Sequence, residues 1–162
     1  MPYLAIAAQA RSEAEFRAAI DRNMPAVFRW VANHGLTPAG PPFIRYLVVD
    51  ESALPGEGPP PASFEAAVPL AAPSPGEGEV LAGELPAGRW LVVLHRGGYS
   101  GLPEAHAILH DWAAEEGVVV DRAPADDGTA YGGAYEQFRI GPVGEGDPWK
   151  WETDVAYLLA DG

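Results

Sequence analysis

One order of sequence patterns occurs twice along this chain, and this repeat constrains the fold more than any other feature. In each half, a strand pattern is followed by an apolar helical stripe that ends in the motif Trp-x-x-x-x-Gly. The motif comprises Trp30 and Gly35 in the first half, and Trp112 and Gly117 in the second. Two further strand patterns follow each helix. A unit of this kind leaves one face of its sheet uncovered, so two units are expected to pack together.

We therefore predict a single α+β domain over residues 1–162, made of a first half at 1–78 and a second half at 79–162. The predicted fold is a tandem strand-helix-strand-strand repeat with pseudo-two-fold symmetry, a mostly antiparallel sheet and a ligand groove between the halves. With 162 residues, 48% of them hydrophobic, the chain is long enough to bury one core.

Local patterns place the elements of the first half. Strands are expected at residues 3–8, 43–49 and 64–70. Ser12 and Glu15 fit a capping box that opens a helix, and Gly35 ends it. Pro25 interrupts the apolar stripe, so we expect two helical pieces or a kink there.

The second half repeats the order after two proline-rich loops. The loops are expected at residues 55–61 and 73–78, the strands at 88–96, 135–140 and 149–159, and the helix from about 102 to 117. The segment 88–96 is rich in β-favouring residues and is the strongest strand pattern in the chain.

The glycine-rich stretch at residues 132–151 carries the candidate chemistry. Alternation along the strand at 135–140 places Glu136 on the same side as Phe138 and Ile140. A carboxylate among apolar and aromatic groups is costly to bury, and burial usually raises its pKa. Such a group is either tolerated at a sheet edge or retained for a purpose.

The repeat helps to choose between these two interpretations. If the equivalent strands align by their aromatic residues, Ile44 takes the position of Glu136. An acid present in only one half is not required by the fold, which favours a functional role. Glu65 and Glu152 recur in both halves, which favours an architectural role for them.

Three segments carry a resemblance to a known family. These are residues 87–117 (AGRWLVVLHRGGYSGLPEAHAILHDWAAEEG), YEQF at 135–138, and WKWETDVAYLL at 149–159. In this order they resemble the GyrI-like small-molecule-binding family. That family includes effector domains of multidrug-responsive transcription regulators and stand-alone proteins, and its fold is a tandem strand-helix-strand-strand pair.

The resemblance implies a role for Glu136. In the family, the acid of an E-x-aromatic strand motif lies at the base of an aromatic pocket and meets the positive charge of lipophilic cations. The aromatic residue is usually Tyr, whereas this chain has Phe138. Some stand-alone members hydrolyse cyclopropane-bearing DNA-alkylating antibiotics with a Tyr and a Glu, so Glu136 is the catalytic candidate if this chain is an enzyme.

Aromatic side chains near the proposed groove are the candidate ligand contacts, because flat rings stack on planar or cationic molecules. Together with Glu136, the predicted ligand-binding residues are Tyr46, Tyr99, Tyr131, Tyr135, Phe138, Trp149 and Trp151.

Composition excludes several other classes. The formal net charge of −13 makes nucleic acid an unfavourable direct partner. The absence of Cys excludes thiolate catalysis and cysteine-bound zinc. His106 and His110 are spaced i, i+4, but no HExxH motif is present. We therefore expect no metal and no cofactor, and the sequence supports no Ser-His-Asp triad.

Three functions stay open. We favour a non-catalytic protein that binds hydrophobic or cationic small molecules, with no membrane association. The first alternative is a hydrolase that opens a cyclopropane ring, with Glu136 as general base or as a group that polarises a tyrosine. The second is a protein-interaction module whose partner is unknown. Residues 2–8 are apolar but have no basic leader, so we reject a signal peptide and expect a cytoplasmic location.

Overall fold

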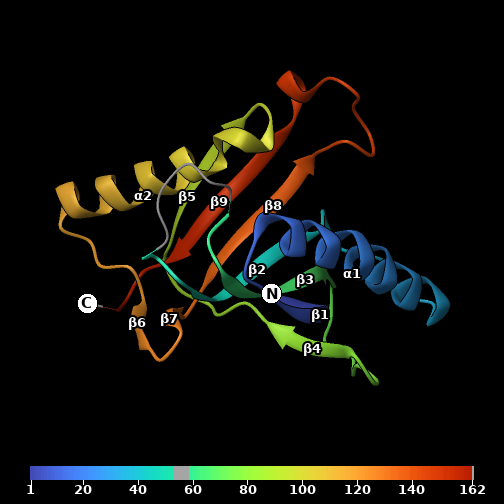
Figure 1. The fold of residues 1–162 in the computed structure, drawn as a ribbon. Helices are drawn as coiled ribbons and strands as arrows, with labels where there is room; N and C mark the ends of the chain where they lie inside the picture. The colour runs from blue at the N-terminus through green and yellow to red at the C-terminus, as the bar shows by residue number, and fades with distance from the viewer. Residues whose placement is uncertain (53–58, 162) are drawn as a thin grey trace.

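The computed structural model describes residues 1–52 and 59–161 (Figure 1). The helices are α1 (Glu13–Asn33) and α2 (Leu102–Glu116), with short 3-10 turns η1 (Tyr99–Gly101) and η2 (Pro148–Lys150). The strands are β1 (Pro2–Ala10), β2 (Phe43–Val49), β3 (Ala62–Pro69), β4 (Val80–Glu84), β5 (Trp90–Arg96), β6 (Arg122–Ala125), β7 (Gly128–Tyr131), β8 (Ala134–Ile140) and β9 (Glu152–Leu158). The predicted α+β fold is confirmed.

The two halves form one antiparallel sheet with a symmetric strand order. The order is β4-β1-β3-β2-β8-β9-β5, so the run β1-β3-β2 meets its mirror order β8-β9-β5 at the β2–β8 pair. In that pair Ile44 is directly opposite Glu136. Its neighbours pair crosswise, Phe43 with Gln137 and Arg45 with Tyr135.

This register locates the pseudo-two-fold axis. A residue on a two-fold axis pairs with its own equivalent, and aligning the aromatic residues of the two strands makes Ile44 and Glu136 equivalent. The axis therefore passes between Ile44 and Glu136, at the centre of the sheet. The carboxylate of Glu136 therefore lies at the junction of the two halves.

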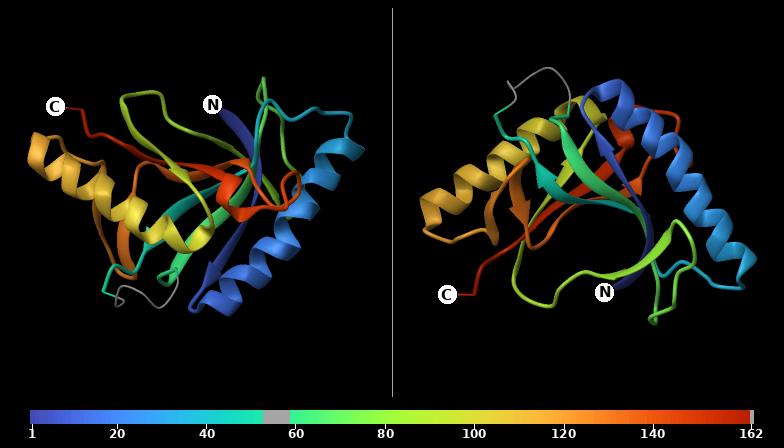
Figure 2. Two further views of the ribbon diagram at one scale, coloured as in Figure 1. Left: turned by 90° about the horizontal axis from the view of Figure 1, so that it is seen from above. Right: turned by 60° about the horizontal axis from the view of Figure 1, so that its bottom comes forward.

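Both helices cover the same face of the sheet (Figures 1 and 2). Val27 and Val31 on α1 are buried, as are Leu109 and Ala113 at the equivalent turns of α2. One apolar cluster contains α2 residues together with Ile44 from β2 and Val155 from β9, and partly buried residues of α1 pack against it. The helix-covered face is thus a core shared by the two halves.

The start of α1 follows the predicted capping pattern. The Ser12 side chain accepts a hydrogen bond from the Glu15 backbone N–H at 3.2 Å, and the Glu15 carboxylate accepts one from the Arg11 N–H at 2.7 Å. Gly35 follows the end of the helix with φ of +69°, in the left-handed region that favours glycine.

Pro25 does not divide α1, so of the two predicted outcomes, two helical pieces or a kink, the first is wrong. Pro25 lies on the exposed side of the helix. The carbonyl group that it leaves without a partner can therefore face water, while Val27 and Val31 hold the next two turns against the sheet. Packing outweighs the local cost of the proline.

Three strands were not predicted, namely β4, β6 and β7. All are short and lie at the margin of the sheet, and they contain residues that weaken strand patterns, such as Gly83 in β4 and Pro124 in β6. The last strand also begins later than expected, because Pro148 starts η2 and places Trp149 in that turn. Residues 73–78 form a loop as predicted, whereas residues 55–58 of the other predicted loop lie outside the described residues.

Within the described ranges, neither α1 nor α2 combines the length and the apolar composition that crossing a membrane requires.

Candidate functional site

Glu136 lies in the middle of β8, on the helix-covered face, and is only 5% exposed. Two side chains contact its Oε1 atom. The Tyr46 hydroxyl of β2 donates a hydrogen bond at 3.1 Å, and Nε2 of His106 on α2 lies at 2.7 Å. The carboxylate is therefore held by one partner from the first half and one from the second.

His106 links Glu136 to a second tyrosine. Its Nδ1 atom lies 2.5 Å from the hydroxyl oxygen of Tyr157 on β9. A carboxylate only accepts hydrogen bonds, so Nε2 carries the proton that faces Glu136. In the neutral imidazole Nδ1 then accepts from Tyr157, and in the imidazolium form it donates to Tyr157. The arrangement suits either charge state of the ring.

The tyrosines in this cluster stay protonated over a wide pH range. Burial, followed by the charge of Glu136, raises the pKa of Tyr46 well above its ordinary value. Burial also raises the pKa of Tyr157, with further contributions from Tyr131 and Glu136. Both hydroxyls therefore remain available as hydrogen-bond donors at neutral pH.

Aromatic rings extend from Glu136 toward the surface. Phe138, two residues along β8, contacts Tyr99 of η1 with ring centroids 5.5 Å apart, and Tyr99 contacts Trp151 at 4.8 Å. The pKa of Tyr99 is raised by burial and then by the charge of Glu136. Tyr99 is thus close enough for the charge of Glu136 to affect its pKa, although its side chain remains partly exposed.

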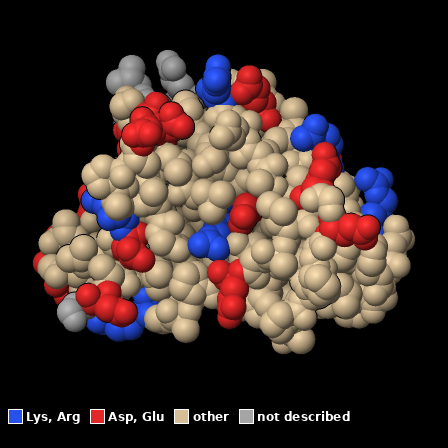
Figure 3. Space-filling model, turned by 90° about the horizontal axis from the view of Figure 1, so that it is seen from below, with Lys and Arg blue, Asp and Glu red and all other residues tan. Residues whose placement is uncertain are grey.

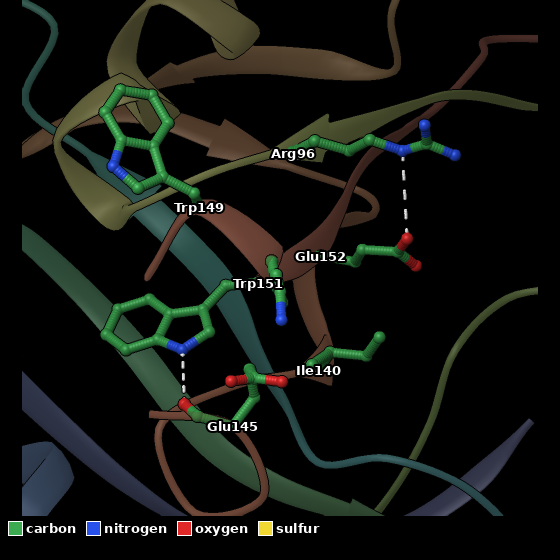
Figure 4. Close-up of a pocket in the computed structure, with 7 residues that line it drawn as sticks. Arg96, Ile140, Glu145, Trp149, Trp151 and Glu152 are labelled. Carbon is green, nitrogen blue, oxygen red and sulfur yellow. Dashed lines mark hydrogen bonds and ion pairs between the residues drawn. The ribbon is translucent and has the colours of Figure 1, made fainter. Parts of the chain in front are cut away.

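The outer end of this aromatic row borders a hollow of about 410 Å³ (Figure 4). The two indole rings of Trp149 and Trp151 lie on one side of it, and an ion pair between Arg96 and Glu152, with 3.7 Å between nitrogen and oxygen, lies on the other. The Trp151 indole N–H donates to the Glu145 carbonyl oxygen at 2.8 Å. Trp149 is 86% exposed. Glu136 is not among the residues that line the hollow.

The structure does not bring all the predicted site residues together. Tyr46 contacts Glu136, and Tyr99 and Phe138 lie beside it. Tyr131 lies behind the cluster, where its ring is 5.3 Å from that of Tyr157 and its hydroxyl donates to Glu51.

Tyr135 lies on the opposite face of the sheet, packed against Phe43 and Trp90. Ile140 also leaves the face of Glu136, contrary to the alternation expected from sequence. A bulge between Phe138 and Ile140 shifts the register, so Ile140 pairs with Glu152.

His106 and Tyr157 are the site residues that the sequence analysis missed. His106 was considered only as a metal ligand, in a pair with His110. A usable signal was present, because counting back from the two Trp-x-x-x-x-Gly motifs aligns His106 with Met24 of α1. His106 is thus a polar residue whose equivalent in the other half is apolar, and the same is true of Glu136 and Ile44. In the part of the chain that the structure describes, no group of three or more His, Asp or Glu side chains is arranged as a metal site.

Charges are mixed on the surface seen in Figure 3. Each group of Lys or Arg atoms on that face lies beside Asp or Glu atoms, and the blue atoms form no continuous patch there. This face does not offer the extended basic surface that phosphate backbones require.

No family model and no curated protein matches the sequence. Solved structures do match it. The C-terminal domain of EcmrR has a TM-score of 0.75 and 17% identity, over 99% of this chain and 92% of that one. EcmrR in its complex with DNA gives a TM-score of 0.74 at 18% identity, over 99% of this chain, which spans 54% of the EcmrR chain.

Two further structures show the same likeness at lower identity. SAV2435 bound to tetraphenylphosphonium has a TM-score of 0.56 and 8% identity, over 99% of this chain and 88% of that one. A hydrolase from Listeria innocua has a TM-score of 0.60 and 13% identity, over 99% and 87%. This chain therefore shares its fold with the EcmrR C-terminal domain and with these other structures. In particular, it is the GyrI-like fold that the sequence resembles.

Proposed function

We propose that this protein binds small molecules at the junction of its two halves, and that its ligands are lipophilic, aromatic and often cationic. The observation that carries the proposal is the position of Glu136. It is a buried carboxylate on the pseudo-two-fold axis, where the equivalent residue of the other half is Ile44. A fold that accepts isoleucine at this position does not need the acid.

The surroundings of Glu136 suit a lipophilic cation. A carboxylate with little access to water attracts positive charge more strongly than one at the surface, because the effective dielectric is lower. The rings of Phe138, Tyr99 and Trp151 extend from the carboxylate toward the solvent. Such rings supply stacking area and cation–π attraction, which are tolerant of ligand shape.

The site also supplies the tyrosine hydroxyl that the GyrI-like motif usually carries at the position of Phe138. Tyr46 is the equivalent of Phe138 in the first half, and its hydroxyl donates to Glu136. Structures of the same fold agree with this ligand class, since SAV2435 holds tetraphenylphosphonium, a lipophilic cation.

The test is a fluorescence titration with a cationic rhodamine dye, which quenches tryptophan. We expect micromolar quenching by the native protein and at least tenfold weaker binding by Glu136→Gln, which keeps the shape and removes the charge. Glu152→Gln is the matched control, because Glu152 lines the hollow beside Trp149. Equal affinity for the native protein and Glu136→Gln would contradict the proposal, and a loss confined to Glu152→Gln would move the site to the hollow.

A second candidate function is hydrolysis of a strained ring, and the Tyr46–Glu136–His106 contacts favour it. Within them a carboxylate is in hydrogen-bond contact with an imidazole and a protonated hydroxyl, as general acid–base catalysis requires. Glu136 would take a proton from water, the hydroxide would bond to a cyclopropane carbon, and the ring bond would break as its electron pair receives a proton from a neighbouring acid such as Tyr46. A hydrolase is also among the structures of this fold.

Turnover separates the two functions. Incubation with a cyclopropane-bearing alkylator yields the ring-opened, hydrated product only if the protein is a hydrolase. Loss of product in Glu136→Gln and in Tyr46→Phe, with product retained in Glu152→Gln, would support catalysis. Binding without product supports the first proposal alone.

A further inference from the structure

We infer that His106 is a built-in counter-ion for Glu136, and that a cationic ligand binds by taking the place of its positive charge, with release of a proton. This inference rests on the proposed function and adds to it a rule for selecting ligands. The site would exchange a proton for a cation, so pH would set its affinity for charged ligands and leave neutral ligands unaffected.

The first support is the direct contact. Nε2 of His106 lies 2.7 Å from Oε1 of Glu136, within hydrogen-bonding distance. Among the described residues, this is the ion pair that Glu136 makes. A protonated His106 therefore neutralises the same charge that a ligand cation would seek.

The second support is the placement of the two side chains. His106 comes from α2, in the layer above the sheet, whereas Glu136 lies in the sheet itself. The side chain of His106 is 22% exposed and that of Glu136 only 7%. His106 is thus the more exposed member of the pair. A cation that reaches Glu136 from the helix side meets the imidazole first.

The third support is the comparison between the two helices. Met24 of α1 occupies the position of His106, partly buried against the shared core. The core tolerates an apolar residue there, just as it tolerates Ile44 at the position of Glu136. The imidazole and the carboxylate are thus both departures from the repeat, and they contact each other. If Glu136 were present only for packing, an imidazole at position 106 would not be needed beside it.

Two titratable groups contact the pair directly: Tyr46 of β2 donates to Glu136, and the Tyr157 hydroxyl of β9 contacts Nδ1 of His106. Tyr99 of η1 is close enough for the charge of Glu136 to raise its pKa, and His95 of β5 lies against Gly101 at the start of α2. His110, one turn further along α2, has Glu51, Asp111 and Arg122 as its charged neighbours. The tyrosines have raised pKa values and do not titrate near neutral pH. Burial, followed by the charge of Arg122, lowers the pKa of His110, which favours its neutral form at neutral pH.

The sign of the pH effect follows from this exchange. At low pH the ligand must displace a proton from His106, which weakens cation binding. As pH rises and the free protein loses that proton, affinity for a permanent cation increases, by at most about tenfold per pH unit for one proton. A ligand without charge gains nothing from displacing the imidazolium. The pH dependence therefore reports how much of the ligand's affinity depends on its charge.

The experiment uses tetraphenylphosphonium, whose charge does not depend on pH, in calorimetric titrations between pH 5.5 and 8.0. Native protein is expected to bind it at least fivefold more tightly at pH 8.0 than at pH 5.5. It should also release close to one proton per cation at the lower pH, as measured in buffers of different ionisation enthalpy. His106→Gln keeps a neutral donor and should bind more tightly at pH 5.5, with no proton release and a flat profile.

The matched control is His34→Gln, because His34 stacks on Trp30 at the end of α1 and is not part of the Glu136 cluster. It should behave like the native protein. A His106→Gln variant that keeps the native slope and proton release would overturn this inference while leaving cation binding intact. If neither native protein nor His106→Gln binds tetraphenylphosphonium at any pH, the proposed function itself fails.

Ring ¹⁵N chemical shifts give a readout that does not depend on affinity. At pH 6 the addition of tetraphenylphosphonium should convert His106 from imidazolium to neutral imidazole and leave His34 unchanged. An imidazolium signal that persists in the saturated complex would contradict the exchange.

Discussion

The two halves of the molecule use one scaffold and differ at its centre. Where the first half has Met24 above Ile44, the second has His106 above Glu136. The surrounding core is alike in the two halves, since α1 and α2 both bury two apolar side chains at matching turns. Two equivalent positions near the symmetry axis are thus apolar in the first half and are a carboxylate and an imidazole in the second. If the fold is stable with apolar residues at both positions, the acid and the imidazole of the second half are not required for folding.

The strand pairing in the two halves also corrects the alignment of two acidic residues that the sequence suggested. Glu65 was matched with Glu152, but the strand registers match Glu65 with Asp154, because Glu65 pairs with Arg45 and Asp154 pairs with the equivalent Gln137. Both matched acids lie beside polar partners on the face away from the helices, where Arg139 contacts Asp154 at 2.5 Å. The alignment of Glu65 with Glu152 is therefore wrong, whereas the architectural role of these acids stays a prediction.

The largest predicted loss of stability comes from a substitution in the core that the two halves share. Phe64 is fully buried and its ring contacts Phe16 with centroids 4.8 Å apart. Phe64→Ala should cost about 3–5 kcal/mol of unfolding free energy, measured with denaturant. The transition should stay single, because both halves pack on one cluster. Leu81→Ala, at an exposed site on β4, should cost little. Two separate unfolding transitions would contradict the interpretation that the two halves form one domain.

A double variant would make the second half like the first. Glu136→Ile alone removes the partner of His106 and is expected to cost about 1–3 kcal/mol. Adding His106→Met should recover part of that loss, because it removes the unpaired imidazole, while the hydroxyls of Tyr46 and Tyr157 stay without the partners that they have in the native protein. Thermal unfolding of the two variants measures the recovery. A double variant less stable than Glu136→Ile would show that the fold does require the acid and the base.

Alkaline pH should weaken both halves together. All six tyrosines have raised pKa values, and that of Tyr3 rises to about 12 through burial and then the hydrogen bond to Glu65. The stabilisation that Tyr3 provides is therefore complete below pH 10 and is lost as pH rises from 10 through 12. Absorbance at 295 nm should show little tyrosinate at pH 10 in the native state and normal ionisation in denaturant. Ordinary titration of most tyrosines with the fold intact would contradict this.

The smallest expected effect separates the two helix starts. Ser12 caps α1 through its side chain, whereas α2 begins after Gly101 without a side-chain cap. Ser12→Ala should cost about 1 kcal/mol, because it leaves a backbone N–H of the first turn unpaired. Gly101 lies against the His95 ring, so substitution there should disturb packing and leave capping unchanged. Denaturant unfolding that shows no loss in Ser12→Ala would mean that packing alone holds α1 in place.

Sequence patterns predicted the parts of the fold that depend on long periodic segments. The strand at 43–49 has the predicted bounds, and the helix that ends at Gly117 does so with φ of +68°. The repeat also anticipated a sheet of two joined units. The short strands β4, β6 and β7 were missed because strands at a sheet margin need few β-favouring residues.

The site was predictable only in part. Alternation along β8 placed Glu136 and Phe138 on one face, and the same alternation placed Tyr135 on the other. Proximity in sequence wrongly suggested that Tyr135 shares their surroundings. The contact of His106 with Glu136 depends on how α2 docks on the sheet, which no local pattern encodes.

The most direct test of the central claim is the location of a bound lipophilic cation. A crystal structure of the protein with tetraphenylphosphonium should place the cation against the carboxylate of Glu136, with its rings on Tyr99 and Phe138 and with His106 moved away from Oε1. A cation bound instead between Trp149 and Trp151, with the contact between His106 and Glu136 intact, would contradict the account.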